Sequence, residues 1–419
     1  MVGEIKFILM DLIIKYMKIL LGHNFYRSSA PSGEDGVYRN ERKLLEDNGV
    51  EIISYEKFND DLNDSSLKNR VKIAMDSAWS SESYQELSKL IKKSKPDVVH
   101  FHSIFPQISP SAYAACFDNG VPVVHTLHNF RPICPGAMLI RDGKPCEDCV
   151  GTNLLPSLVH KCYRDSLLAT GANAWQITRN RWAGNYQKVS RFITLTEFSA
   201  SRYVKAGFNK DRLVVKPNFL PARARALKNE FLIKNNTSDY AVYVGRLSEE
   251  KGVRTLINAW CNVTAIPLKI IGDGVLRDEL ERFVKNNGLN VEFLGFLPND
   301  EVLKVVAHSK LQVIPSECYE GFPMVVVEAY ALGVPIVASR IGSLEEVIIE
   351  GETGLKFTPG SSMDLAEKVN KLIGSDSLRI KMKKNAQDVF KNYYTADANF
   401  KMLNAIYHQV IEENKEVIG

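Results

Sequence analysis

The 419-residue sequence has only 7 cysteines, too few to hold a chain of this length together with disulfides. It shows no secretory signal, because Asp11 interrupts the apolar residues 7–14 and no small-residue cleavage site follows. A second apolar run, 321–338, contains Glu328 and two prolines, which favours a buried helix and strand over a membrane span. These absences predict a cytoplasmic protein.

The sequence also lacks a strong net charge, because its 53 lysines and arginines and 49 aspartates and glutamates give a formal charge of +4. Such a small excess does not indicate a nucleic-acid binder. The balance is uneven, because residues 1–215 carry 28 basic and 23 acidic side chains and residues 216–419 carry 25 and 26. A basic first half suits an anionic substrate or an anionic membrane surface; ordinary scatter of surface charge is the alternative.

What the sequence does have is length and a regular alternation of short β-rich runs with longer helical stretches. Its length exceeds the roughly 250–300 residues that one hydrophobic core can reach, and the alternation predicts an α/β protein with parallel sheets. Strands are expected at 18–22, 50–53, 97–102, 122–126, 191–195, 213–216, 240–244, 268–271, 291–294, 311–314, 335–338 and 354–357. Helices are expected at 37–47, 109–118, 253–263, 276–287, 299–308, 324–332 and 363–373, with two more closing the chain.

The predicted fold is two doubly wound Rossmann-like domains facing each other across a cleft. The stretch 217–238, rich in Pro, Ala and Asn, is the expected linker between them. Residues 1–16 do not fit the alternation and form an N-terminal extension. That extension either has no structural role or is a short surface helix that touches a membrane or a partner.

Ligands of doubly wound sheets bind at the carboxyl ends of the strands, and the loop at 315–323 stands out there. Gly321 lets the backbone approach a ligand, and the helix that starts near Pro323 offers free N–H groups to a phosphate. Glu320 lies in the loop and Glu328 about a turn into the helix, so the two carboxylates could hold hydroxyl groups at two ends of an extended ligand. Alternatively, an acidic residue supports the helix dipole and the other glutamate is a surface residue.

A second loop follows the strand at 240–244. Arg246 and Lys251 bracket its polar turn, and a guanidinium with an ammonium at a strand–helix junction is the outline of a diphosphate clamp. The alternative is that Lys251 is an ordinary helix-start residue. A third loop, Gly272-Asp273-Gly274, also follows a strand but lacks the further glycine of a dinucleotide fingerprint.

The segments GRLSEEKG, IGDG and EGFPMVVVE and the strand GVPIVA, in this order and spacing, resemble glycosyltransferase family 4 over about residues 17–395. The resemblance implies the GT-B fold, with an acceptor-binding domain at 17–216, a nucleotide-sugar-binding domain at 239–395 and a C-terminal helix at 396–419 that packs back on the first domain. It also implies a hexosyltransferase that is retaining and metal-independent. The donor would be a nucleotide-diphosphate sugar and the acceptor a saccharide or a lipid-linked sugar, in polysaccharide or glycolipid biosynthesis.

The same resemblance implies roles for individual residues. Arg246 and Lys251 would grip the donor diphosphate, Glu320 would contact the sugar hydroxyls and Glu328 the ribose hydroxyls. His128, in HTLHN, resembles the family histidine that lines the donor pocket. The implied catalytic residues are Arg246, Lys251, Glu320 and His128, and the remaining donor-binding residues are Gly245, Gly272, Asp273, Gly274, Gly321, Phe322 and Pro323.

Two further positions bear on the acceptor side and on a departure from the family. Gly33, Glu34 and Asp35 resemble an acceptor-binding loop of one branch of the family, and the same residues suit a helix N-terminus with an acidic first turn. Ser343 replaces the second glycine of a Gly-Gly pair that is usual after the preceding strand, which puts one backbone contact in doubt.

Four of the cysteines, Cys134, Cys146, Cys149 and Cys162, lie in one excursion at 134–162 of the first domain. The C-E-D-C pair resembles a zinc knuckle, and four thiolates can form a closed structural zinc site. Disulfide or redox pairing and unliganded thiols are the alternatives. No catalytic zinc is expected, because the sequence shows no open set of three histidine ligands.

No Asp-x-Asp occurs in the chain, so a metal-chelating way of neutralising the diphosphate is not evident. The positive charge would then come from Arg246, Lys251 and helix N-termini, and no cofactor is required for catalysis. Our hypothesis is a front-face reaction without a glycosyl-enzyme intermediate. A sugar-nucleotide epimerase or phosphorylase on the same fold and a non-catalytic nucleotide-sugar-binding subunit are the alternatives. An acceptor at the inner face of a membrane would make the protein peripheral to it.

Overall fold

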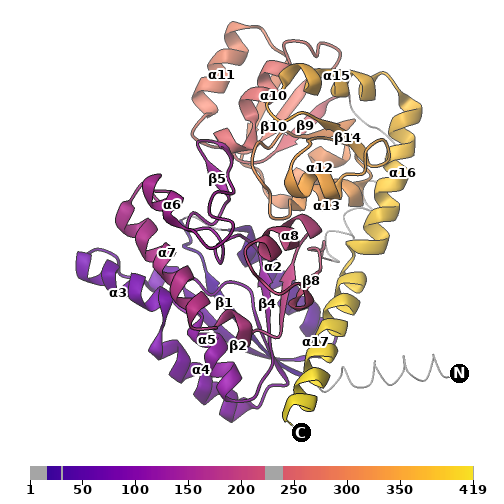
Figure 1. Ribbon diagram of the computed structural model, residues 1–419. Helices are drawn as coiled ribbons and strands as arrows, with labels where there is room; N and C mark the ends of the chain where they lie inside the picture. The colour runs from indigo at the N-terminus through magenta and orange to yellow at the C-terminus, as the bar shows by residue number, and fades with distance from the viewer. Residues whose placement is uncertain (1–16, 30–31, 222–238, 419) are drawn as a thin grey trace, which may run out of the picture.

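Twelve short runs rich in Val, Ile and Leu form the strands of two parallel six-stranded sheets (Figure 1). The computed structural model describes residues 17–29, 32–221 and 239–418. The first sheet has the order β2-β1-β3-β4-β7-β8 and the second β11-β10-β9-β12-β13-β14. Their strands are β1 Lys18–Phe25, β2 Glu51–Phe58, β3 Val98–Phe101, β4 Val123–Leu127, β7 Arg191–Thr194, β8 Leu213–Val215, β9 Ala241–Val244, β10 Leu268–Ile271, β11 Val291–Gly295, β12 Leu311–Ile314, β13 Ile336–Ser339 and β14 Gly354–Phe357.

Helices cover both faces of each sheet, so both faces are buried and the strands are almost continuously apolar. Along β9, Ala241 and Tyr243 belong to one core cluster, and the alternate residue Val242 belongs to the cluster on the other face. In the first domain the helices are α2 Gly33–Asp47, α3 Leu67–Ala78, α4 Ser81–Ser94, α5 Ser111–Asp118, α6 Leu155–Val159, α7 Leu167–Trp182 and α8 Glu197–Lys205. A small antiparallel pair, β5 Ile140–Arg141 and β6 Lys144–Pro145, belongs to the cysteine-containing excursion.

The second domain follows the same plan. Its helices are α10 Val253–Ala259, α11 Arg277–Asn286, α12 Asn299–Ala307, α13 Met324–Leu332, α14 Gly342–Val347, α15 Ser362–Ile373, α16 Asp376–Tyr393 and α17 Ala396–Ile418. Short 3₁₀ turns occur at η1 Asn59–Asp61, η2 Tyr186–Lys188, η3 Lys210–Arg212 and η4 Glu249–Lys251.

The predicted fold class, two doubly wound α/β domains, is confirmed, and so is the return of the last helix to the first domain. In Figure 1, α16 runs along the second domain and α17 continues along the first. Leu403, Tyr407 and Val410 of α17 share a core cluster with Ile19 and Leu21 of β1. The predicted extension 1–16 and residues 222–238 of the predicted linker lie outside the described residues.

Several predicted bounds are wrong by a few residues, for identifiable reasons. β1 continues beyond Gly22 because His23 and Asn24 are buried with their side chains hydrogen-bonded to Asp35 and Asn59. α10 ends at Ala259 instead of residue 263, since the amides after Trp260 bond to carbonyls three residues back, which tightens the last turn. None of the described helices is both long and apolar enough to cross a membrane.

Candidate functional site

The loops after β9 and β12 lie on either side of the point where the strand order of the second sheet reverses. Crevices at such switch points are where doubly wound sheets bind their ligands. The two loops touch: a Cβ added to Gly252, whose φ is +66°, would lie 1.9 Å from the carbonyl oxygen of Pro315. The predicted diphosphate clamp, Arg246 and Lys251, and the predicted loop at 315–323, which we call the glutamate loop, therefore belong to one site.

Lys251 and Glu320 form an ion pair in this site. Their Nζ and Oε1 atoms are 2.6 Å apart, and the Ser316 hydroxyl donates to the same carboxylate oxygen at 2.6 Å. Burial lowers the pKa of Lys251, but the charge and the hydrogen bond of Glu320 outweigh it and raise that pKa overall. The ammonium is thus fully charged at neutral pH and positioned by the carboxylate.

Arg246 reaches into solvent, with 70% of its side chain exposed and a contact of 3.3 Å to Glu250. The adjacent glycines interlock two loops. Gly272 has φ +135°, and a Cβ there would lie 1.9 Å from the carbonyl oxygen of Gly245. A Cβ on Gly274 would lie 2.4 Å from the carbonyl oxygen of Leu247. The backbone that carries Arg246 is therefore rigid, while its guanidinium is available to a ligand.

Asp273, Phe322 and Pro323 have structural contacts in the same region. The Asp273 carboxylate accepts from its neighbouring amide Gly274 at 2.7 Å and from Arg277 at 3.1 Å. Phe322 is buried in the core cluster beneath α13, and Pro323 is the N-cap of that helix. The helix N-terminus, with its unpaired amides, thus lies directly after the glutamate loop.

Glu328 lies on α13, and no hydrogen bond to its carboxyl group occurs among the described residues. Burial raises the pKa of Glu328 to about 7. A half-buried carboxyl group without a partner is an acceptor for hydroxyl groups of a ligand.

The first domain contributes His128, which follows β4 and lies against the glutamate loop. A Cβ on Gly321 would lie 2.7 Å from the carbonyl oxygen of His128, so only glycine permits this approach of the two domains. The structure therefore brings His128 of the first half against the loop that carries Glu320, the partner of Lys251. Arg246 lies in the same loop as Lys251, and Glu328 lies in the helix that follows Glu320.

A chain of hydrogen bonds runs from His128 into the first domain. His128 Nε2 is 3.0 Å from His102 Nδ1, and His102 Nε2 is 2.9 Å from Glu41 Oε1. Burial lowers the pKa of His128 well below its ordinary value, so its imidazole is neutral. Because a carboxylate only accepts, His102 donates from Nε2 to Glu41. The neutral His128 ring has one donor and one acceptor nitrogen, and Nε2 is the nitrogen that faces His102.

Glu41 is the centre of this buried network. Lys216 Nζ lies 2.9 Å from Glu41 Oε2 and 3.1 Å from Asn399 Oδ1 of α17. Burial opposes ionisation of Glu41, but the charge of Lys216 and the hydrogen bond from His102 hold its pKa well below the usual value. Among the described residues, the ligand atoms of Glu41, His100 and His102 lie within 4.8 Å of one another, a group of three that could hold a metal ion. The Lys216 ammonium already supplies a positive charge there.

The three predicted acceptor residues lie in the first turn of α2, which begins at Gly33, four residues earlier than predicted. The Ser32 hydroxyl caps the helix by accepting from the Glu34 amide, so the helix N-terminus with an acidic first turn is present. Asp35 turns inward to His23, at 2.9 Å. Glu34 receives a hydrogen bond from Asn129 at 2.8 Å, and burial raises the pKa of Glu34.

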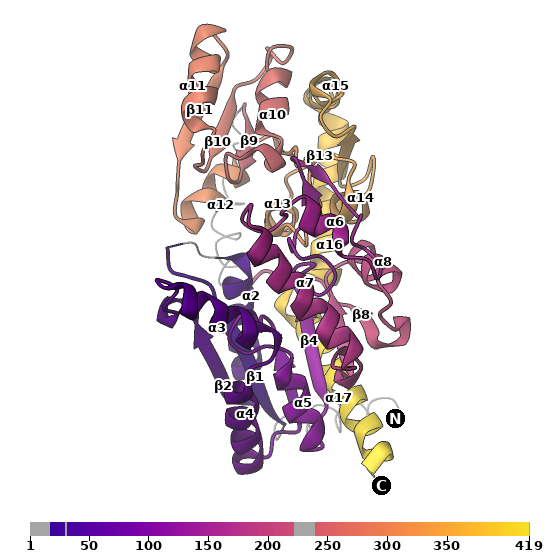
Figure 2. The ribbon, with the colours of Figure 1, turned by 60° about the vertical axis from the view of Figure 1, so that its left-hand side comes forward.

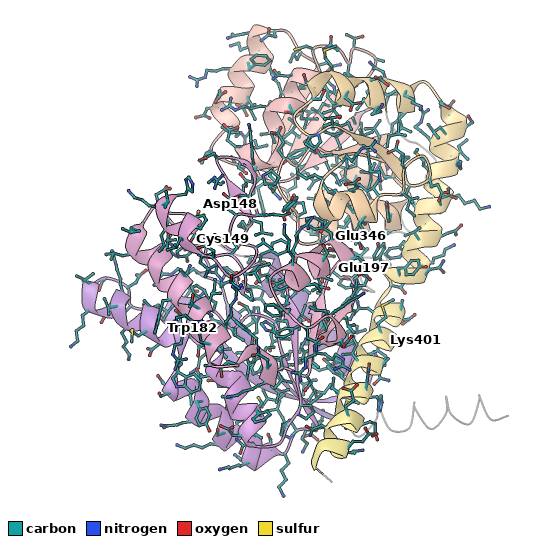
Figure 3. The ribbon with its side chains drawn as sticks, in the orientation of Figure 1. Asp148, Cys149, Trp182, Glu197, Glu346 and Lys401 are labelled. Carbon is teal, nitrogen blue, oxygen red and sulfur yellow. The ribbon has the colours of Figure 1, made fainter. Side chains whose placement is uncertain are left out.

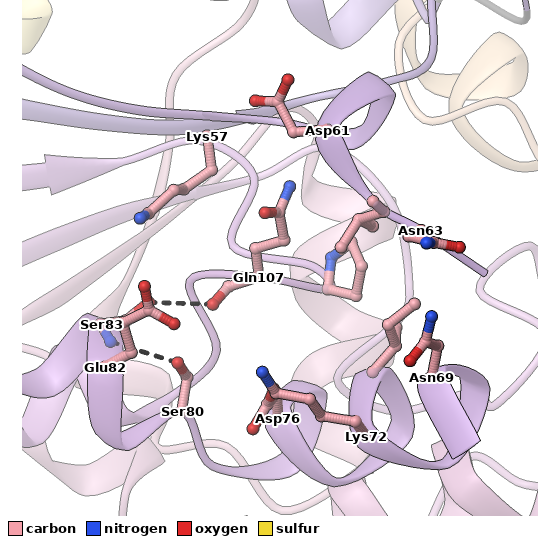
Figure 4. Close-up of a pocket in the computed structure, with 13 residues that line it drawn as sticks. Lys57, Asp61, Asn63, Asn69, Lys72, Asp76, Ser80, Glu82, Ser83 and Gln107 are labelled. Carbon is pink, nitrogen blue, oxygen red and sulfur yellow. Dashed lines mark hydrogen bonds between the residues drawn. The ribbon is translucent and has the colours of Figure 1, made fainter. Parts of the chain in front are cut away.

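A polar cavity of about 290 Å³ opens at the carboxyl ends of β2 and β3, beneath α3 (Figure 4). Its labelled walls include Lys57 near the end of β2, Asn69 and Asp76 of α3, and Gln107 after β3. The Ser83 hydroxyl donates to the Gln107 carbonyl at 2.9 Å. Amide, hydroxyl and charged groups of this kind suit a hydroxyl-rich ligand.

The four excursion cysteines lie near one another as free thiols. A Cβ on Gly136 would lie 3.8 Å from Cys134 Sγ and 3.5 Å from the Cβ of Cys162. Burial and the neighbouring Cys134 and Cys162 raise the pKa of Cys149 to about 11. Within the described part of the chain, their sulfurs do not form a group of three within 4.8 Å. Zinc binding at the excursion stays a prediction.

Sequence reasoning missed residues that join the two domains. The Glu346 carboxylate accepts from the amides of Glu197 and Phe198 at 2.9 and 2.7 Å, which caps α8 from the other domain (Figure 3). The hydroxyl of Ser343 lies 3.0 Å from that of Thr196. The substitution of glycine by serine was visible in the sequence, but its partner was not.

Comparisons with known proteins agree with this geometry. Residues 225–389 match the family described as glycosyl transferases group 1, and residues 67–222 match Glycosyltransferase Family 4. An uncharacterized glycosyltransferase of Methanocaldococcus jannaschii is 34% identical over 283 residues, which are 66% of this chain and 72% of that protein. The alpha-D-kanosaminyltransferase of Streptomyces kanamyceticus is 30% identical over 175 residues, 40% of this chain and 45% of that enzyme. A crystal structure of Anabaena HepE in complex with UDP-glucose has a TM-score of 0.59 and 19% identity, and covers 95% of this chain and 100% of that one.

Proposed function

The chain belongs to glycosyltransferase family 4, which transfers sugars from nucleotide-sugar donors, and from this premise we propose a retaining, metal-independent transfer to a saccharide or lipid-linked acceptor. The single observation that carries the proposal is the Lys251–Glu320 pair at 2.6 Å. It lies beside Arg246 and the N-terminus of α13, so cations and helix amides converge where a donor diphosphate would leave.

In the proposed step, the acceptor oxygen forms a bond to the anomeric carbon on the face from which the diphosphate departs. The carbon–oxygen bond to the diphosphate breaks, its electron pair stays on the phosphate oxygen, and that oxygen takes the acceptor proton. Arg246 and Lys251 neutralise the developing charge, and Glu320 accepts from sugar hydroxyls. Because bond making and breaking share one face, the anomeric configuration is retained.

The second domain holds the donor, and the first domain closes the site. Glu328, without a partner among the described residues, accepts hydrogen bonds from the ribose hydroxyls. Nδ1 of His128, the ring nitrogen that is not bonded to His102, faces the sugar, and Glu34 in the first turn of α2 contacts the acceptor. Since the Anabaena structure contains UDP-glucose, UDP sugars are the first donors to test, followed by GDP and ADP sugars.

The test combines donor binding with turnover. A donor at a hundred times its dissociation constant stabilises the protein by about 2.7 kcal/mol, which a thermal-shift screen detects. With the donor found, Arg246→Ala and Lys251→Ala should each lower the transfer rate roughly 10²–10³-fold, whereas Lys285→Ala, an exposed lysine of the same domain, should not.

Three results would contradict the proposal. A wild-type transfer rate in Arg246→Ala or Lys251→Ala would show that this cation does not neutralise the leaving diphosphate. NMR of the product could show an inverted anomeric centre, which removes the front-face step. EDTA could abolish transfer by the wild-type protein, which removes metal independence. Consumption of the donor without an acceptor, giving an altered sugar nucleotide, would indicate an epimerase.

A further inference from the structure

Three neighbouring helices of the first domain present apolar side chains to solvent. α7 packs against both α3 and α6, and the three lie along the left-hand side of Figure 1, which Figure 2 brings forward. Their exposed apolar residues, which we name the apolar face, are Leu67, Val71, Met75, Leu155, Val159, Leu167, Leu168, Trp175 and Trp182. Leu168 is 81% and Trp182 is 82% exposed. Figure 3 labels Trp182 on this side of the molecule.

The spacing of these residues places them in one line on each helix. The residues on α3 and those on α6 are four apart, and Leu168, Trp175 and Trp182 on α7 are seven apart, so each set lies on one side. On α3 the cavity-lining residues Asn69 and Ile73 lie about half a turn round from that line. The apolar face is therefore the side of these helices turned away from the domain. Exposed patches of this kind mark contact with a protein or a membrane.

Cations lie among the apolar residues. The exposed ones that do not line the polar cavity are Lys68 and Arg70 on α3 and Lys161 and Arg164 between α6 and α7. Residues 67–78 and 155–182 together hold seven basic and two acidic side chains, an excess of +5 against +4 for the whole chain. None of these four exposed cations has an ion pair with a carboxylate in the described parts of the chain. Leucine, tryptophan and unpaired lysine or arginine together are typical of segments that lie in a membrane interface.

We propose that the apolar face docks on an anionic lipid bilayer. The leucine and tryptophan side chains enter the headgroup region, and the four cations meet lipid phosphates. A second copy of this chain is a poorer occupant, because a symmetric contact would bring the same cations against one another. The polar cavity lies one helix away from the bilayer. The inference about the acceptor rests on the proposed transfer reaction: a cavity this close to the bilayer favours a lipid-linked acceptor.

The test is sedimentation of the full chain with extruded vesicles of phosphatidylglycerol and phosphatidylcholine in equal parts. We expect wild-type protein to sediment with them and the double variant Leu168→Ser, Trp182→Ser to partition at least tenfold more weakly. The triple variant Lys68→Gln, Arg70→Gln, Lys161→Gln should partition roughly 100-fold more weakly, since each cation near an anionic surface contributes about fivefold. The matched control is Val275→Ser, Phe296→Ser in the second domain, whose side chains are 89% and 83% exposed; it should sediment like the wild type.

Docking is wrong if the wild type stays in the supernatant or if the control variant loses as much binding as the apolar variant. The docking proposal is also wrong if light scattering shows that the wild type is a dimer and the apolar variant is a monomer, because the apolar face then binds a second copy. Thermal shifts with UDP, measured without vesicles, separate this inference from the proposed reaction. The apolar variant should keep the wild-type shift, and a wild type without any nucleotide shift would contradict the reaction while leaving the vesicle result to stand.

Discussion

At the scale of single residues, Glu328 shows how burial gives a common side chain an unusual property. Its carboxyl group has no partner among the described residues, and its pKa rises from 4.5 to about 7. Below pH 4.5 the carboxyl is protonated in both the folded and the unfolded chain. As pH rises from 4.5 to 7, the unfolded chain releases the proton first, so the stability of the folded chain falls through this range.

This argument predicts the behaviour of Glu328→Gln. The free energy of unfolding of the ligand-free wild type should fall by up to about 3 kcal/mol between pH 5 and pH 8 relative to the variant, as the shift of the pKa requires. Urea denaturation at the two pH values measures it. Glu352→Gln, an exposed glutamate of the same domain, is the control. Equal pH slopes for wild type and Glu328→Gln would show that Glu328 is solvated.

The elements of the first domain are joined by the ion pair of Glu41 on α2 with Lys216 after β8, to which Asn399 of α17 also contributes. The pair also holds His102 and through it His128. Removing one partner leaves the other charge buried, which typically costs about 3–5 kcal/mol. The network therefore links the position of His128 to the packing of the last helix.

We predict that Glu41→Gln lowers the free energy of unfolding by about 3–5 kcal/mol. The double variant Glu41→Gln, Lys216→Met should recover part of that loss, because the unpaired ammonium is then gone. Urea denaturation of the two single variants and the double variant gives the coupling energy. Additive losses would mean that the two side chains do not interact as the structure shows.

A further prediction at the scale of structural elements concerns the cysteine excursion at 134–162. If its thiolates bind a structural zinc ion, purified protein contains one zinc per chain, and Cys146→Ser loses the metal and lowers the melting temperature by several degrees. Atomic emission and thermal unfolding measure both. Cys261→Ser, an exposed cysteine of the second domain, is the control. Protein without zinc, in which the two variants are equally stable, would exclude the metal and leave unliganded thiols.

At the scale of the whole molecule, the two domains meet through polar contacts that belong to neither core. Glu346 caps α8 across the interface, and the Tyr319 hydroxyl, next to Glu320, donates to Glu147 of the excursion at 3.0 Å. Figure 3 shows Glu346 and Glu197 side by side where the domains meet. The conformation of the glutamate loop therefore depends on the position of the first domain.

Glu346→Ala should loosen this arrangement. We expect a larger radius of gyration in solution scattering and a several-fold higher KM for the donor, with a smaller change in kcat, because the loss affects assembly of the site. Glu345→Ala, the exposed neighbour on the same helix, should change neither quantity. A wild-type KM for Glu346→Ala would show that the cap does not contribute to donor binding.

Whether a strand or helix could be predicted from the sequence depends on which way its apolar side chains point. Buried parallel strands are apolar on both faces, so all twelve could be recognised from their composition. The sequence did not predict helices α3, α4, α6, α7, α8 and α14. In α3 and α7, Val71, Trp175 and Trp182 face solvent, so the apolar residues of these two helices do not form a single buried stripe. The second-domain site residues share local motifs and were recognisable, whereas Glu41 and Lys216 are 175 residues apart.

By itself the sequence determined the α/β class, the two sheets and the residue types at the candidate site, because strand burial and loop motifs are local properties of the chain. Only the tertiary structure decided which residues from different halves meet. The contacts of His128 with Gly321, of Glu147 with Tyr319 and of Lys216 with Glu41 depend on the placement of one domain against the other. The same packing decided which apolar and cationic residues stay outside, and the scarce overall charge of +4 concealed a local excess on the apolar face.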